Sequence, residues 1–158
     1  MPGSTERVAD YLNRCGINTK VVRLDKTTRT AELAAQAIGC PVGAIVKSLV
    51  FLADGKPILV LASGDHRVST EKVAALVGAE QVVIARASEV KEITGFAIGG
   101  VPPVAQDNVC AILMDEQLRR FDTVYAAAGS PFDIFPVTPS DLERIAGARL
   151  CDVVEPTD

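Results

Sequence analysis

A lysine lies near the start of an otherwise largely apolar stretch, Ala44-Ile-Val-Lys-Ser-Leu-Val-Phe51. Side chains alternate along a strand, so Lys47 shares one face with Leu49 and Phe51. Apolar residues on both faces are typical of a strand that is buried on both sides. An amine held in such a place can bind a phosphate or a carboxylate, or act with a lowered pKa. Position alone favours the simpler interpretation, an edge-strand lysine whose stem lies on apolar surface while its amine reaches water.

A second candidate is the loop Gly99-Gly-Val-Pro-Pro103. Paired glycines permit backbone angles that other residues avoid, while prolines stiffen the exit of the loop and remove N–H groups. The few remaining amides of such a loop can donate to a carbonyl or to a developing oxyanion. A plain connecting turn is the alternative, and a glycine pair by itself favours that alternative.

Two clusters of small or polar residues come where strands are expected to end. In Ser63-Gly-Asp-His-Arg-Val68, Asp65 and His66 could contact a ligand, because binding residues often gather at such places. His66 could act as an acid or a base, but a simple surface histidine is the favoured interpretation. In Ala126-Ala-Ala-Gly-Ser-Pro131, small side chains leave space either for a ligand or for tight packing of a neighbour.

Several kinds of site find no support in the residues. With one histidine in the chain, no serine–histidine–acid set can be assembled, and neither a Walker motif nor a dinucleotide fingerprint is present. The four cysteines are spread widely without a C-x-x-C pair, which argues against a zinc site. We expect four reduced, mostly buried thiols, no metal and no cofactor.

Helices and strands that could position these residues alternate along the chain. Thr30, Ser69 and Thr138 are suited to cap helices, and Asp54-Gly55 is a strong hairpin signal between two aliphatic strands. The predicted fold is a single α+β domain over residues 1–158, with a mixed, largely antiparallel β-sheet curled into a partial barrel and surrounded by helices. We expect helices over residues 5–15, 31–38, 70–77, 88–94 and 139–146, a turn over 41–44, and strands over 19–24, 46–53, 57–62, 81–85, 110–114, 123–127, 133–137 and 149–154.

The composition limits the class of protein. With 158 residues, 48% of them hydrophobic and 23% charged, the chain is long and apolar enough to bury a core. It has no apolar run of membrane-spanning length and no signal-peptide pattern, so we expect a cytoplasmic, soluble protein without a membrane partner. The net charge of −4 argues against a protein that grips a long duplex such as DNA, but it permits local contacts to a short RNA end.

Taken together and in order, these segments resemble the YbaK/ProX family, whose members are stand-alone relatives of the editing domain inserted in some bacterial prolyl-tRNA synthetases. The resemblance covers almost the whole chain. It rests on Gly43-Ala-Ile-Val-Lys-Ser-Leu-Val-Phe51, on Gly64-Asp-His-Arg-Val68 and above all on Thr94-Gly-Phe-Ala-Ile-Gly-Gly-Val-Pro-Pro-Val-Ala-Gln106. It implies a partly barrel-like mixed sheet and hydrolysis of amino acids wrongly attached to tRNA, in the first place Cys- or Ala-tRNA(Pro).

The resemblance also implies how a site without a catalytic triad could act. The family's near-invariant lysine falls on Lys47, beside the terminal adenosine and its phosphate, and its Gly-x-x-Pro loop falls on Gly100 and Pro103, where the backbone holds the aminoacyl carbonyl. An aminoacyl ester is already activated, so the site chiefly needs positioning and stabilisation of the tetrahedral oxyanion. In relatives, a ribose hydroxyl or the cysteine thiol of the substrate helps the attack. Arg29, Lys47 and Arg67 could supply local positive charge.

One position departs from the family pattern. Two residues after the strand's tyrosine, relatives specialised for Cys or Ala carry a serine or histidine where this chain has Ala127. An alanine there indicates a small or moderately apolar amino acid, with Ser130 as an alternative polar contact. Thr30 falls where relatives line the amino-acid pocket, although capping of a helix explains it equally well. We therefore expect catalytic roles for Lys47 and Gly100, and substrate contacts by Thr30, Gly99, Val101, Pro103, Asp65, His66, Ala127, Gly129 and Ser130.

The leading hypothesis is a trans-acting deacylase that binds the acceptor end of mischarged tRNA, with tRNA(Pro) as the favoured substrate and an aminoacyl-tRNA synthetase as a candidate partner. The departure at Ala127 supports a second hypothesis, a non-catalytic module of the same fold that binds tRNA or a synthetase. A third hypothesis, a Schiff-base enzyme acting on a small carbonyl compound, uses Lys47 but leaves the glycine–proline loop unexplained. The sequence leaves open the amino acid removed, the way tRNA identity is read and the oligomeric state.

Overall fold

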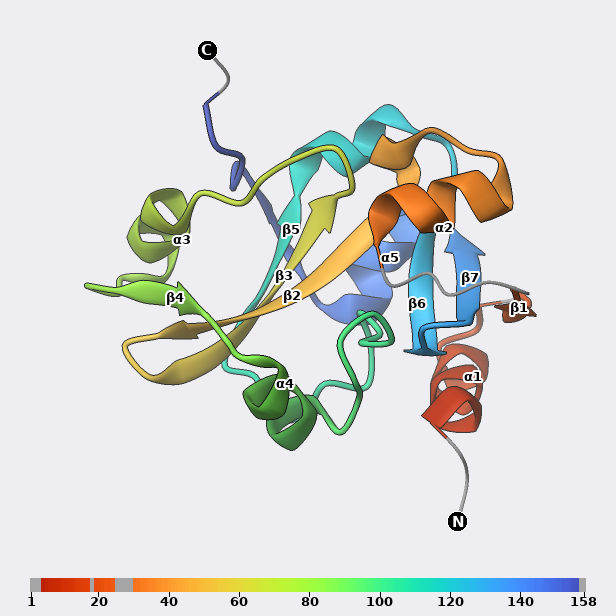
Figure 1. Ribbon diagram of the computed structural model, residues 1–158, viewed down its shortest axis with the longest axis horizontal. Coiled ribbons are helices and arrows are strands. Elements are labelled where there is room, and N and C mark those ends of the chain that lie inside the picture. The colour runs from red at the N-terminus through yellow and green to blue at the C-terminus, as the bar shows by residue number, and fades with distance from the viewer. Residues whose placement is uncertain (1–3, 18, 25–29, 157–158) are drawn as a thin grey trace.

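The computed structural model describes residues 4–17, 19–24 and 30–156, in which helices are interleaved with single strands and with two pairs of consecutive strands (Figure 1). The helices are α1 (Ser4–Arg14), α2 (Ala31–Ile38), α3 (Thr70–Val77), α4 (Ala87–Thr94) and α5 (Pro139–Ala146), with two 3₁₀ segments, η1 (Val42–Ala44) and η2 (Glu116–Arg120). The strands are β1 (Val22–Arg23), β2 (Val46–Ala53), β3 (Lys56–Ser63), β4 (Val82–Ile84), β5 (Ile112–Asp115), β6 (Val124–Ser130), β7 (Asp133–Val137) and β8 (Arg149–Cys151). None of the helices in this part of the chain has the length and apolar character needed to cross a bilayer.

Two sheets form the framework. The five-stranded sheet has the order β4-β2-β3-β5-β8, in which β4, β2 and β3 pair antiparallel while β3, β5 and β8 run parallel. The three-stranded sheet, β1-β7-β6, is antiparallel throughout, and a parallel bridge between Ile45 and Tyr125 connects it to the start of β2. The described strands do not close into a barrel, so the predicted α+β fold with a largely antiparallel, partly barrel-like sheet is confirmed.

The hairpin of β2 and β3 is present as predicted and pairs without a register shift along its whole length. Asp54 and Gly55 have φ angles of 49° and 84°. Such angles characterise the two-residue turns whose twist matches the twist of the flanking strands. The Asp54 carboxylate also accepts hydrogen bonds from the N–H groups of Glu80 and Gln81, which fixes the chain directly before β4 against the turn.

Both faces of β2 are covered. Val46 lies in the main core cluster, which joins residues of both sheets, such as Phe135, with residues of α1, α4 and α5. Phe51 lies in a second cluster with Val73 of α3. The prediction of a strand buried on both faces is therefore confirmed, and Lys47 belongs to a strand with little room for a charge.

The predicted caps explain where most helices begin. The hydroxyl groups of Thr30, Ser69 and Thr138 each accept an N–H from the first turn of α2, α3 and α5, and these three helices have their predicted bounds. Helix α1 is shifted by one residue toward the N-terminus. Helix α4 begins one residue earlier than predicted, because the Glu89 carboxylate accepts the N–H of Arg86 and so caps the helix from within its first turn.

Several predicted strands have different bounds, and the largest changes have physical causes. The strand expected over residues 19–24 is reduced to β1, because the antiparallel register would place Pro136, which has no N–H to donate, opposite Lys20. The strand expected over 149–154 ends as β8, because its partner β5 gives way to η2 after Asp115. The ends of β3, β4 and β5 differ from the prediction by one or two residues.

Strand β6 is longer than predicted and runs on to Ser130 instead of ending at residue 127. Its register with β7 shifts after Ala127, and Ser130 then pairs with Asp133. A bulge of this kind lets a strand bend and continue. Gly129 and Ser130 therefore belong to the strand and not to a loop that follows it.

Candidate functional site

A cavity of about 390 Å³ lies beside the first half of β2. Its walls come from the start of α2, from β2, from the end of β4, from α4 and the loop that follows it, and from β6, so segments far apart in the sequence meet around it (Figure 1). Most of the wall is apolar. The described residues that line it are Thr30, Ala31, Glu32, Ala34, residues 45–50, Gly64, Ile84, Ala85, Val90, Ile98, Gly99, Val101, residues 125–127 and Ile134.

Thr30 caps a helix, as its residue type predicts, and it also lines the cavity. Its hydroxyl accepts the N–H of Leu33 at 3.2 Å and caps α2, and the residue also lines the cavity. The same local geometry that starts the helix therefore places this side chain at the edge of the cavity. The capping hydrogen bond leaves the lone pairs of the oxygen only partly used.

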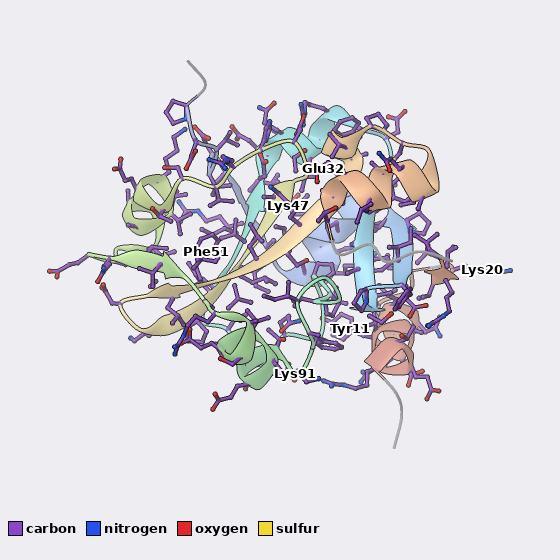
Figure 2. The ribbon with its side chains drawn as sticks, in the orientation of Figure 1. Tyr11, Lys20, Glu32, Lys47, Phe51 and Lys91 are labelled. Carbon is purple, nitrogen blue, oxygen red and sulfur yellow. The ribbon has the colours of Figure 1, made fainter. Side chains whose placement is uncertain are left out.

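Lys47 is half-buried in the cavity wall, where Figure 2 shows it close to Glu32 of α2. Its amine donates a hydrogen bond to the main-chain carbonyl of His66. Burial lowers the pKa of Lys47 below its ordinary value, against the opposing attraction of the carboxylates of Glu32, Asp65 and Asp115. Lys47 is thus a held and partly desolvated amine, in contrast to the surface lysine that its position in the sequence favoured.

Asp115 fixes the turn that contains His66 and thereby holds the Lys47 amine. The Asp115 side chain is fully buried and accepts the N–H of Ser63 at 3.1 Å and that of Gln117 at 2.9 Å. It also lies 2.8 Å from Nδ1 of His66. Because a carboxylate can only accept, Nδ1 must carry the proton in this contact. His66 therefore supports the cavity from behind, through its ring and its carbonyl, and does not line it.

Asp65 also belongs to this supporting turn. Its carboxylate accepts hydrogen bonds from Arg120 at 3.0 Å and from the hydroxyl of Ser63 at 2.9 Å. Although burial alone would raise the pKa of Asp65, these hydrogen bonds hold it below its ordinary value. Gly64 is the member of this turn that reaches the cavity wall.

The glycine–proline loop contributes Gly99 and Val101 to the cavity. The N–H of Gly100, which lies between them, already donates to the carbonyl of Ala97 at 2.9 Å. The N–H groups of Gly99 and Val101 donate to no acceptor within the part of the chain that the structure describes. Val101 is buried and Gly99 half-buried, so the lack of a protein acceptor leaves these two donors available for a ligand oxygen.

Gly100 has a different task, which its lack of a side chain explains. A Cβ atom built on Gly100 would lie 2.8 Å from Cα of Ser130 and 2.9 Å from its carbonyl carbon. Only glycine allows the loop to approach the β6 backbone so closely. This close approach seats the loop and thereby places its two neighbours at the cavity.

The remaining predicted site residues divide into those that reach the cavity and those that do not. Ala127 of β6 lines it. The Ser130 hydroxyl does not, because it donates to Asp133 and accepts the N–H of Phe132. The structure thus brings Thr30, Lys47, Gly99, Val101 and Ala127 together around one cavity and places Gly100, Pro103, Asp65, His66, Gly129 and Ser130 outside its lining.

Sequence reasoning missed three polar residues of the wall, Glu32, Ser48 and Tyr125. Glu32, in the first turn of α2, carries the one carboxylate among the described lining residues. Ser48 of β2 has a buried hydroxyl oxygen without a hydrogen-bond partner in the described part of the chain. The signal for Ser48 was available, since it is a polar residue between Val46 and Val50 on an otherwise apolar face.

Of the described residues that were expected to supply local positive charge, only Lys47 lines the cavity. Arg67 lies close enough to Lys47 to lower its pKa but does not line the cavity. Arg29 falls outside the described residues. Within the described ranges, histidine, cysteine and acidic side chains form no cluster that could hold a metal ion.

Comparison with known proteins identifies families and structures that are similar to this chain. The aminoacyl-tRNA editing domain family matches residues 25–145. A solved structure described as a candidate trans-editing enzyme for prolyl-tRNA synthetase is 43% identical, covers 99% of both chains and superposes with a TM-score of 0.90. The uncharacterised protein YwhH of Bacillus subtilis is 30% identical over 148 residues, which are 93% of this chain and 94% of that protein.

A segment of a larger protein is also similar. The proline–tRNA ligase of Lactobacillus helveticus is 36% identical over 100 residues, which are 63% of this chain and 18% of the ligase. The likeness to that ligase therefore concerns one portion of it.

Proposed function

The chain belongs to the aminoacyl-tRNA editing domain family, and we propose that it is a trans-acting deacylase that hydrolyses the ester bond of mischarged tRNA. The editing domain is of the prolyl-tRNA synthetase type, which makes tRNA(Pro) the favoured tRNA. Its substrate would enter by the acceptor end, and a synthetase that releases mischarged tRNA is the candidate protein partner. This work would take place in the cytoplasm, where tRNA is charged.

The observation that carries the proposal is the convergence of one amine and two unused amides on a single cavity. Lys47 supplies the positive charge, and Gly99 and Val101 supply N–H groups without another acceptor among the described residues. Hydrolysis of an ester passes through a tetrahedral intermediate whose oxygen becomes negative, and preorganised N–H donors stabilise that charge. An amine and amides of this kind match what such a reaction needs from a protein, which supports the proposal.

In the proposed mechanism, Lys47 binds the phosphate or sugar edge of the terminal adenosine, and the loop of Gly99, Gly100 and Val101 receives the ester carbonyl. Gly100 acts by holding the loop against Ser130, so its catalytic contribution is positional. The described lining contains no histidine, and its one carboxylate, Glu32, lies at the exposed edge of the cavity, so we assign the orientation of the attacking water to the substrate's own hydroxyl group. Positioning of this kind supplies a large share of the rate in reactions of activated esters.

The wall that would face the amino-acid side chain is mostly aliphatic. Ala126 and Ala127 of β6 and Val46 and Val50 of β2 all line the cavity. Small and moderately apolar side chains fit such a wall best. The unpartnered hydroxyl of Ser48 offers one polar contact, which would favour an amino acid with a group that can hydrogen-bond.

A panel of mischarged tRNAs tests the proposal. Wild type, Lys47→Ala and the exposed hairpin control Lys56→Ala are each incubated with tRNA(Pro) carrying different wrong amino acids, and loss of the ester is followed over time. We expect wild type and Lys56→Ala to hydrolyse at least one of these esters and Lys47→Ala to hydrolyse the same ester at least about tenfold more slowly. If wild type hydrolyses none of them but binds the charged tRNA, the non-catalytic binding module replaces the deacylase. Borohydride trapping of a covalent adduct between Lys47 and a small carbonyl compound would instead support Schiff-base chemistry.

A further inference from the structure

We propose that Glu32 binds the α-ammonium group of the aminoacyl ester, an inference that rests on the proposed deacylase function. Around the cavity, the described lining residues include one carboxylate, Glu32, and one ammonium, Lys47. An aminoacyl ester presents two features to such a site, an ester carbonyl and, one carbon away, a positively charged amine. The ammonium of Lys47 complements a phosphate of the aminoacylated tRNA end, and the carboxylate of Glu32 complements its α-ammonium group.

Glu32 is free to take such a cation. It lies at an exposed edge of the cavity as the second residue of α2, and Figure 2 shows it beside Lys47. The two side chains attract each other, since Glu32 opposes the fall in the pKa of Lys47. Nevertheless, no ion pair within 4.0 Å and no hydrogen bond joins the Glu32 carboxylate to any residue that the structure describes, Lys47 included.

Because Lys47 is positively charged, binding of a substrate ammonium in the same cavity requires a negatively charged group. A substrate ammonium placed in the same cavity as a lysine ammonium is repelled, and partial burial strengthens this repulsion because less water screens it. The other polar lining side chains, Thr30, Ser48 and Tyr125, are neutral. Glu32 is therefore the one described lining residue that can compensate the charge of the amine while Lys47 binds a phosphate.

Two alternative roles of Glu32 would give different results. An acidic residue in the first turn stabilises a helix whatever the ligand. Glu71 is a matched case, because it occupies the second position of α3, another eight-residue helix with a hydroxyl cap, and does not line the cavity. Alternatively, Glu32 could act only through Lys47 by keeping its amine protonated, and then its loss would affect every substrate that needs Lys47.

The test compares wild type, Glu32→Gln and Glu71→Gln on two substrates. One is an aminoacyl-tRNA that wild type hydrolyses, and the other is the matching α-hydroxyacyl-tRNA, in which a neutral hydroxyl replaces the ammonium. The assay is run at pH 6.5, below the usual α-amino pKa of about 7.7–8.0, so that the substrate amine is charged. The readout is the ratio of kcat/KM for the two substrates, which a merely structural role would leave unchanged.

We expect Glu32→Gln to lower kcat/KM for the aminoacyl ester about tenfold, an effect between that of losing an exposed ion pair and that of losing a desolvated one. The same variant should change kcat/KM for the hydroxyacyl ester less than about twofold. Glu71→Gln should leave both values unchanged. Equal losses on both substrates, or no loss on the aminoacyl ester, would overturn the proposal for Glu32 while leaving the deacylase function standing. A wild type that hydrolyses neither ester would instead overturn the proposed function, and the role of Glu32 with it.

Discussion

Replacing Lys47 by methionine tests whether the amine of Lys47 acts on the substrate or only stabilises the fold. Methionine keeps the apolar stem of the lysine and removes its charge and its hydrogen bond to the carbonyl of His66. A hydrogen bond between a charged donor and its acceptor contributes about 1.5–3 kcal/mol, so loss of the same kind of contact to a substrate phosphate should lower kcat/KM by roughly 10- to 150-fold. The companion variant Lys56→Met removes an exposed lysine of the same hairpin and should leave kcat/KM unchanged.

The fold should tolerate this substitution. Loss of the hydrogen bond to His66 destabilises the protein, but removal of a partly desolvated charge offsets that loss, since burial is the main cause of the lowered pKa of Lys47. We expect the free energy of unfolding to change by no more than about 1 kcal/mol, which corresponds to a shift in Tm of about 2–4 °C for a chain of this size. Thermal unfolding followed by circular dichroism measures this shift.

The pH dependence of stability provides a second measurement on the same pair of proteins. The pKa of Lys47 in the folded protein is lower than its ordinary value of 10.5, so between these two values the unfolded chain binds a proton that the folded chain has lost. The stability of the wild type relative to Lys47→Met should therefore rise with pH in this window. A methionine variant with the wild-type kcat/KM, or one that unfolds more than about 10 °C below wild type, would refute the assignment of Lys47 as a functional amine.

Three further substitutions test the framework of the site. Gly100→Ala should lower the free energy of unfolding by about 1–3 kcal/mol and should also lower the rate of deacylation, because the new methyl group would lie 2.8 Å from Cα of Ser130. An unchanged Tm would show that the loop does not pack against Ser130. Thr30→Ala should destabilise the protein by about 0.5–2 kcal/mol in denaturant titrations through loss of the cap on Leu33, whereas Thr30→Ser should be neutral, and equal effects of the two would exclude capping as the cause. Ala127→Leu should raise KM for the bulkier of two hydrolysed amino acids more than for the smaller, since it fills the cavity, and an equal change for both would place the amino acid elsewhere.

Local chemistry explains why much of the fold could be predicted. The bounds of α2, α3 and α5 follow from capping hydroxyls that lie three residues from the amides they accept, and the β2–β3 hairpin follows from Asp54 and Gly55. These interactions involve neighbours in the sequence, so the residue types alone carry the information. The strand over residues 19–24 was overestimated because its length depends on Pro136, a residue of a distant strand.

In the candidate site, too, some features could be predicted from neighbouring residues and others depended on distant parts of the chain. Lys47 and the glycine–proline loop could be singled out by residue type and order, because amines in apolar strands and glycine pairs before prolines are unusual in themselves. Which atoms of these segments face a ligand depended on contacts across the fold. In the structure the N–H of Gly100 donates to the carbonyl of Ala97, so the two neighbouring residues of the loop line the cavity in its place. Glu32, which the sequence did not single out, lines the same cavity.

The sequence by itself therefore determined the elements, the hairpin and the chemically unusual residues, since these depend on interactions between near neighbours. Only the tertiary structure decided the surroundings of Lys47. Its amine meets a carbonyl 19 positions away, and the ring of that residue is held by Asp115, a further 49 positions along the chain. Such contacts arise from the order of strands in the sheet, in which β5 lies next to β3 and brings a buried carboxylate beneath the turn. An otherwise ordinary strand lysine becomes a held and partly desolvated amine through that arrangement.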